Sequence, residues 1–204
     1  MNEKKFFSTR NITYLAVLLA LVIVFQLISS FVPISEGVSL NLTLVPIVLG
    51  GILLGAMGGA FLGLAFSVIV IIMSVAMPTG LMPIIMSNGL ALTVFIFSTL
   101  LRGFAAGVLP ALLFKLVAIK NAYVATFVAA AAAPVINTTI FILSTLVIFG
   151  ILPNEISMSA LEFFKYLVIT VSGINFLIEL AINIVLSPAI FTIVRVVNAR
   201  RNST

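Results

Sequence analysis

Long apolar stretches run along nearly the whole chain, separated by short segments that contain polar residues, prolines or glycines. A helix needs about 20 apolar residues to cross a bilayer. Residues 40–77 are apolar throughout, and as one helix they would reach roughly 57 Å, far beyond a hydrocarbon core of about 30 Å. Breaking them at the GAMGG segment gives a short helix and a longer one. The pattern therefore predicts six transmembrane helices, at residues 12–32, 40–54, 58–77, 88–116, 122–149 and 165–194.

Composition supports this architecture. The chain is 63% hydrophobic and only 7% charged, so a water-soluble packing could not bury its apolar surface. The N-terminal segment has the basic start of a signal peptide, but its apolar run is long enough to span and no A-x-A cleavage site follows it. Nothing marks a second domain. We therefore expect an all-α integral membrane protein that forms one compact bundle of six transmembrane helices over residues 1–204.

The positions of the charges predict the orientation of the bundle. If the N-terminus is cytoplasmic, Lys165 alone lies outside, and the inner side carries Lys4, Lys5, Arg10, Lys115, Lys120, Arg195, Arg200 and Arg201. This distribution follows the positive-inside rule, with both termini cytoplasmic. The net charge of +5 is then a record of membrane topology, and we predict no nucleic-acid partner.

The segment between the third and fourth predicted spans, residues 77–87, combines prolines and Gly80 with apolar methionines. It is too apolar for an ordinary linker. We predict a loop that folds back toward the membrane and closes over a ligand, with Gly80 as a hinge.

Two charges lie in the middle of predicted spans, far from their ends. Arg102 is about fourteen residues from either end of the fourth span, and Glu179 is about fourteen residues after Lys165, so helical rise places both near the midplane. An arginine there costs roughly 2.5 to 3.5 kcal/mol on insertion scales. Two explanations stay open at this point: a buried ion pair that fixes packing, or a cavity in which one or both charges bind a polar ligand.

Amide side chains accompany these charges. Asn175, Glu179 and Asn183 recur every fourth residue, so they share one face of the sixth helix. Asn137 lies in the middle of the fifth span, and Asn88 stands where the fourth span begins. A single intramembrane asparagine is more often a contact between helices, but this set predicts a polar pocket formed by the last three spans. The candidate substrate-binding residues are Arg102, Asn88, Asn137, Asn175, Glu179 and Asn183.

Small residues form a second pattern. Gly51, Gly55, Gly59 and Gly63 recur every fourth residue, which predicts close backbone approach across the hairpin of the second and third spans. In the first span, Ala16 and Ala20 form an A-x-x-x-A pair suited to docking another helix.

Several kinds of chemistry are excluded. The chain has no cysteine, histidine or aspartate, which removes thiol chemistry, most zinc sites, Ser-His-Asp catalysis and intramembrane aspartyl chemistry. It also has no P-loop and no G-x-S-x-G motif. We therefore predict a protein that is not an enzyme and that uses no metal and no cofactor.

Several segments together resemble one transporter family. These are TRNITYLAVLLAL at the N-terminus, LVPIVLGGILLG from Leu44 to Gly55, and KLVAIKN at the end of the fourth span. With about 200 residues and six predicted spans, the chain resembles the substrate-binding S components of energy-coupling factor (ECF) vitamin transporters. The segments LLRGFAAGVLPALLFKL and PVINTTIF further resemble the branch assigned to pantothenate.

The resemblance implies an importer subunit without its own energy source, in the cell membrane of a prokaryote. It would bind a vitamin near the outer side, under its first and third loops. The face of Ala16 and Ala20 would pack on a transmembrane T component that is coupled to two cytoplasmic ATPases. The alternative is a self-sufficient secondary transporter or channel for a small polar solute, which usually has inverted repeats and more spans than this chain.

Overall fold

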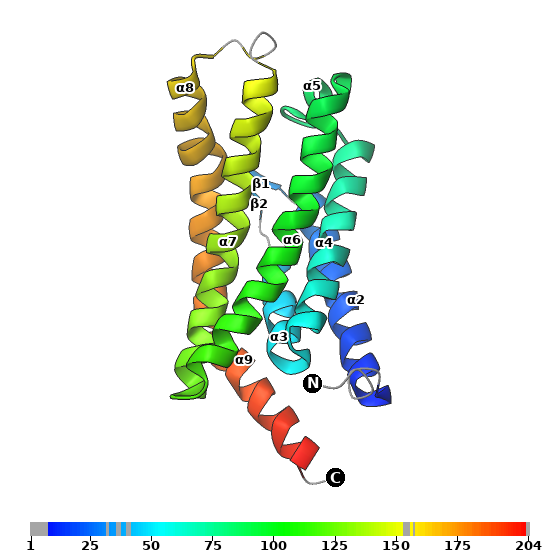
Figure 1. Cartoon of the computed structure of the whole chain (residues 1–204), viewed down its shortest axis with the longest axis vertical. Coiled ribbons are helices and arrows are strands. Elements are labelled where there is room, and N and C mark those ends of the chain that lie inside the picture. The colour runs from blue at the N-terminus through cyan, green and yellow to red at the C-terminus, as the bar shows by residue number, and fades with distance from the viewer. Residues whose placement is uncertain are drawn as a thin grey trace.

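The computed structural model of the chain describes residues 8–31, 33–35, 38–39, 42–152, 156 and 158–202. Nearly all of these residues are helical, and the long helices stand side by side in one elongated bundle (Figure 1). In chain order the elements are α2 Thr9–Phe31, β1 Pro33–Ser35, β2 Val38–Ser39, α3 Leu44–Leu54, α4 Ala56–Ala76, α5 Met82–Ser87, α6 Gly89–Val117, α7 Ala122–Ile151, α8 Ala160–Lys165, the π-helical segment η1 Tyr166–Gly173 and α9 Ile174–Asn202. Strands β1 and β2 pair antiparallel.

Five helices are long and apolar enough to cross a membrane: α2, α4, α6, α7 and the continuous helix Ala160–Arg200. They coincide with five of the predicted spans, so a multi-pass helical membrane protein is confirmed. The remaining predicted span, at residues 40–54, is not confirmed as a helix that crosses the membrane. In its place α3 has 11 residues and is about 16 Å long, roughly half of the hydrocarbon thickness.

Helix α2 begins, and helix α9 ends, at the same end of the bundle (Figure 1). This agrees with two termini on one side of the membrane. Which side is cytoplasmic stays a prediction from the charges, of which Lys4 and Lys5 lie outside the described residues.

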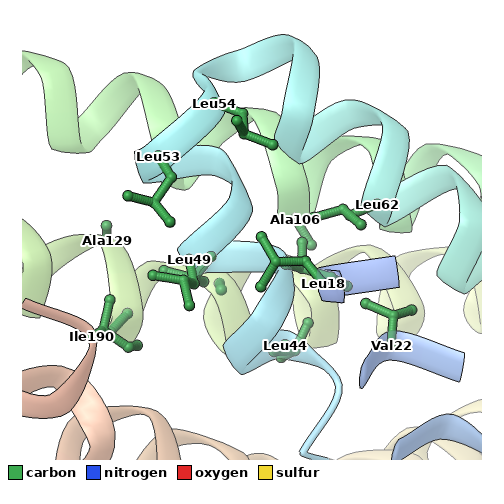
Figure 2. Close-up of a cluster of buried hydrophobic side chains, with 14 of the residues drawn as sticks. Leu18, Val22, Leu44, Leu49, Leu53, Leu54, Leu62, Ala106, Ala129 and Ile190 are labelled. Carbon is green, nitrogen blue, oxygen red and sulfur yellow. The ribbon is translucent and has the colours of Figure 1, made fainter. Parts of the chain in front are cut away.

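Short as it is, α3 lies at the centre of the half of the bundle nearest these ends (Figure 1). Its sequence, LVPIVLGGILL, has no polar side chain, as expected for a helix that is buried on all sides. Figure 2 shows its leucines facing side chains of five other helices: Leu18 and Val22 of α2, Leu62 of α4, Ala106 of α6, Ala129 of α7 and Ile190 of α9. Close packing of these side chains stabilises the arrangement, because lipid is as apolar as the core itself.

The glycine row makes its closest approach to α6. A Cβ atom on Gly59 or Gly63 would collide with the backbone carbonyls of Gly107 and Gly103, respectively, and the reverse substitutions collide in the same way. We call these four residues the glycine contact. Gly51 also lies close to Gly59, so the close backbone approach predicted across the α3–α4 hairpin is confirmed, and the still closer approach to α6 was not predicted. The G-x-x-x-G pair in α6 supplies the partner.

The segment at residues 77–87 is only partly a loop. Gly80 has a φ of 60°, the left-handed region that glycine adopts without strain. From Met82 onward the chain forms α5, so the prediction of a loop is wrong there. Met82 and Ile85 are buried among side chains of α7 and α8, including Ile148 and Phe163. Closure of this segment over a ligand stays a prediction.

Candidate functional site

A polar cavity of about 210 Å³ lies inside the bundle. Its walls come from α2, α4, α6, α7, η1 and α9. The polar lining residues are Gln26, Ser29, Arg102, Asn137, Thr138, Ser172, Asn175 and Glu179, and the apolar ones are Phe66, Val70, Phe141 and Val171. Its volume is below the roughly 300 to 1,000 Å³ of pockets for drug-sized ligands. The arrangement therefore suits a small polar molecule.

Arg102 projects from α6 into the cavity between two aromatic rings. The guanidinium carbon lies 5.8 Å from the ring centroid of Phe66 and 5.5 Å from that of Phe141, both within cation–π range. Its Nε atom is buried and has no hydrogen-bond partner. The rings contact the cation without using its hydrogen-bond donors, so the Nε donor keeps its capacity to bind another group.

Glu179 lies opposite on α9 and is 5% exposed. Its carboxylate attracts the Arg102 guanidinium electrostatically, and its Oε2 atom accepts a long hydrogen bond of 3.5 Å from Asn137 Nδ2. The structure thus brings Arg102, Glu179 and Asn137 to one cavity, from three helices that the sequence predicted to meet.

The polar ladder on α9 only partly reaches the cavity. Asn175 lines it and donates to the carbonyl oxygen of Val171 at 3.0 Å. Asn183 does not line it: this residue is fully buried one turn farther along, and its amide donates to the carbonyl oxygen of Glu179 at 2.8 Å. The structure therefore places Asn175 and Glu179, but not Asn183, at the cavity surface.

Asn88 lies away from the cavity, at the start of α6. It is the N-cap of α6, where its side-chain oxygen accepts hydrogen bonds from the backbone amides of Leu90 and Ala91 at 3.0 and 3.1 Å. These bonds satisfy amides that have no partner within the helix. Asn88 does not line the cavity.

Four polar residues of the cavity were missed in the sequence: Gln26, Ser29, Thr138 and Ser172. Gln26 is buried in α2, and its side-chain oxygen accepts a hydrogen bond from Thr43, just before α3, at 3.3 Å. The signal for Gln26 was available, because it is an isolated amide within an apolar span. A serine in a membrane helix gives no comparable signal, since it usually bonds to its own backbone.

The described part of the chain contains no cluster of three or more histidine, cysteine or acidic residues that could hold a metal ion. Away from the cavity, Ala16 and Ala20 are exposed on the outer face of α2. That face therefore has room for another helix, as the docking hypothesis requires.

Comparison with protein families gives one match. The model of a family described as ECF transporter, substrate-specific component, matches residues 10–191. Comparisons with curated proteins and with solved structures gave no match.

Proposed function

Because the chain belongs to the family of substrate-specific components of ECF transporters, we propose that it captures a small carboxylate vitamin, with pantothenate as the best candidate. It takes this substrate from outside the cell and delivers it through a T component powered by two separate ATPases. Members of this family are transporter subunits, and the family implies association with a T component and ATPases. The observation that supports an anionic substrate is the position of Arg102.

An arginine offers a rigid fork of donors that can hold a carboxylate in two parallel hydrogen bonds. Here Phe66 and Phe141 fix the guanidinium, and the Nε donor has no partner among the described residues. In a site partly shielded from water, such charge-assisted bonds are strong. Glu179 balances the charge of Arg102 when no anion is bound, and this limits the cost of a membrane-buried cation.

Pantothenate is favoured over other vitamins by the rest of the lining. It carries one carboxylate, one amide and two hydroxyl groups, and the cavity supplies amide side chains from Asn137 and Asn175 beside the cation. A neutral flavin would have less need of Arg102. Asn88 and Asn183, which we also predicted to contact substrate, lie outside this cavity, so we do not include them in the proposed contact set.

The substrate proposal is tested by binding measurements on the purified subunit. We expect Arg102→Ala to weaken binding of pantothenate by about 100-fold, because it removes charge-assisted hydrogen bonds. Arg102→Lys keeps the charge but loses the fork, and should weaken binding less. Isothermal titration with both variants measures this order. Wild-type affinity in Arg102→Ala would rule out the substrate role of Arg102.

The orientation and docking proposals use the outer face of α2. With both termini cytoplasmic, the T component would pack on Ala16 and Ala20. Replacing both by tryptophan should abolish uptake in cells while the isolated subunit binds pantothenate as before, because bulk on that face blocks only helix approach. Equal loss of binding and uptake would contradict this role. Purification in mild detergent without any ATPase partner would instead favour a self-sufficient transporter.

A further inference from the structure

Two buried polar atoms at the cavity have no hydrogen-bond partner in addition to Arg102 Nε. They are Oδ1 of Asn137 and Oγ of Ser172, in side chains that are 6% and 4% exposed. Both residues line the cavity. Buried polar atoms are nearly always paired in folded proteins, because leaving one unpaired is costly. Asn183 Oδ1 is also unpaired but lies away from the cavity, whereas the atoms of Asn137 and Ser172 belong to residues that line a space in which a bound molecule can supply the missing partner.

Ser172 lacks the local hydrogen bond that most helical serines among the described residues make. Six other helical serines donate their hydroxyl to a backbone carbonyl three or four residues earlier: Ser30, Ser67, Ser87, Ser98, Ser144 and Ser187. This local bond is the usual arrangement for serine in a helix. Ser172 makes no such bond, so its hydroxyl is available to the cavity.

The π-helical segment explains this availability. On the inner face of the last helix, the buried residue after Leu167 is Ser172, five positions on, whereas Phe163 to Leu167 and Glu179 to Asn183 are steps of four. Because η1 has wider turns, Val171 and Ser172 both line the cavity. Such π-helical turns often occur at functional sites.

Glycine at position 173 permits the wide turn. A Cβ atom there would lie 2.7 Å from the carbonyl oxygen of Val168, five residues earlier. Real Cβ atoms essentially never come so close to a backbone oxygen. Any larger side chain must therefore shift the turn that presents Ser172.

The next step rests on the proposed function. The unpaired atoms of Asn137 and Ser172 differ from Arg102 in hydrogen-bonding character, because the guanidinium can only donate. Asn137 Oδ1 only accepts, and the Ser172 hydroxyl can donate or accept. We propose that Asn137 and Ser172 form a second subsite that recognises a hydroxyl group of the substrate, while Arg102 holds its carboxylate. Ser172, presented by η1, is then a specificity-determining residue: it selects hydroxylated carboxylates over deoxygenated ones of similar shape.

The experiment compares two probes, pantothenate and its dideoxy analogue, in which hydrogen replaces both hydroxyl groups. We expect the wild-type subunit to bind pantothenate about tenfold more tightly than the analogue. Ser172→Ala should lower the affinity for pantothenate about tenfold and leave the affinity for the analogue unchanged. Gly173→Ala should have the same selective effect, because it displaces the turn.

Two matched variants serve as controls. Ser98→Ala removes a hydroxyl that is bonded to Phe95 and does not line the cavity, and Gly150→Ala adds a Cβ atom where no atom lies within 4 Å. Both should bind each probe like the wild type. An equal loss for both probes in Ser172→Ala would overturn the hydroxyl subsite while leaving the carboxylate proposal in place. A wild-type protein that binds neither probe would overturn the proposed substrate and this inference with it.

Discussion

Helices α4 and α6 meet in two different ways along their length. At the glycine contact, Gly59 and Gly63 of α4 lie against the backbone of α6, and the Ser67 hydroxyl packs beside Gly103. Three residues after Gly63 on α4 and one residue before Gly103 on α6, Phe66 and Arg102 line the polar cavity instead. At the glycine contact the Ser67 hydroxyl is satisfied, because it donates to the carbonyl oxygens of Gly63 and Thr99, whereas the cavity contains buried polar atoms without partners. The comparison indicates that the two helices leave no space between them at the glycine contact, whereas at the cavity they enclose polar groups that do not fully satisfy one another.

The largest expected effect is at the glycine contact. Gly107→Leu should prevent correct folding, because its Cβ atom would collide with the backbone carbonyl of Gly59. A backbone obstacle cannot repack, so the loss of stability should exceed the roughly 1 to 3 kcal/mol of ordinary overpacking. Size-exclusion chromatography and thermal unfolding in detergent measure it. Gly150→Leu, at a site with no atom within 4 Å, is the control and should remain folded; equal stability of the two variants would refute the contact's importance.

The second prediction separates fold from function in the cavity. The double change Arg102→Leu with Glu179→Leu removes both charges, so we expect a folded protein whose pantothenate binding is about 100-fold weaker. Arg102→Leu alone leaves the Glu179 carboxylate without its neighbouring cation and should lower the free energy of unfolding by about 3 kcal/mol. Thermal unfolding and titration of the same samples test both. A well-folded double variant with wild-type affinity would show that Arg102 and Glu179 only stabilise each other and do not bind substrate.

The smallest effect is expected at Asn88, outside both regions. Asn88→Ala removes the cap of α6 and should lower the free energy of unfolding by about 1 kcal/mol. Because Asn88 does not line the cavity, pantothenate affinity should stay unchanged. Thermal unfolding and titration measure the two quantities, and a clear loss of affinity would return Asn88 to the substrate contacts that we first predicted.

The candidate residues at the cavity were chosen because of the high cost of polar groups in a membrane, and their contact with substrate stays a prediction. Arg102, Glu179, Asn137 and Asn175 were singled out because lipid cannot satisfy them, and the structure brings these four to one cavity. Asn88 and Asn183 met the same criterion, but their side chains bond to helix backbones away from the cavity, and the Oδ1 atom of Asn183 has no hydrogen-bond partner among the described residues. Sequence identifies a polar group that needs a partner, but it does not say whether that partner is a ligand or the chain itself.

The sequence by itself determined the five long helices and the membrane environment, because both depend only on the length and apolar character of continuous segments. Tertiary structure alone decided that α3 lies buried at the centre of one half of the bundle, that the glycines of α4 pack against α6, and that Ser172 of η1 lines the cavity. Each of these depends on which backbone lies beside which. A glycine in the sequence shows that another helix can approach closely, but not which helix does so. A π-helical turn also changes which residues share one face of a helix, so a regular helical period does not predict that face correctly.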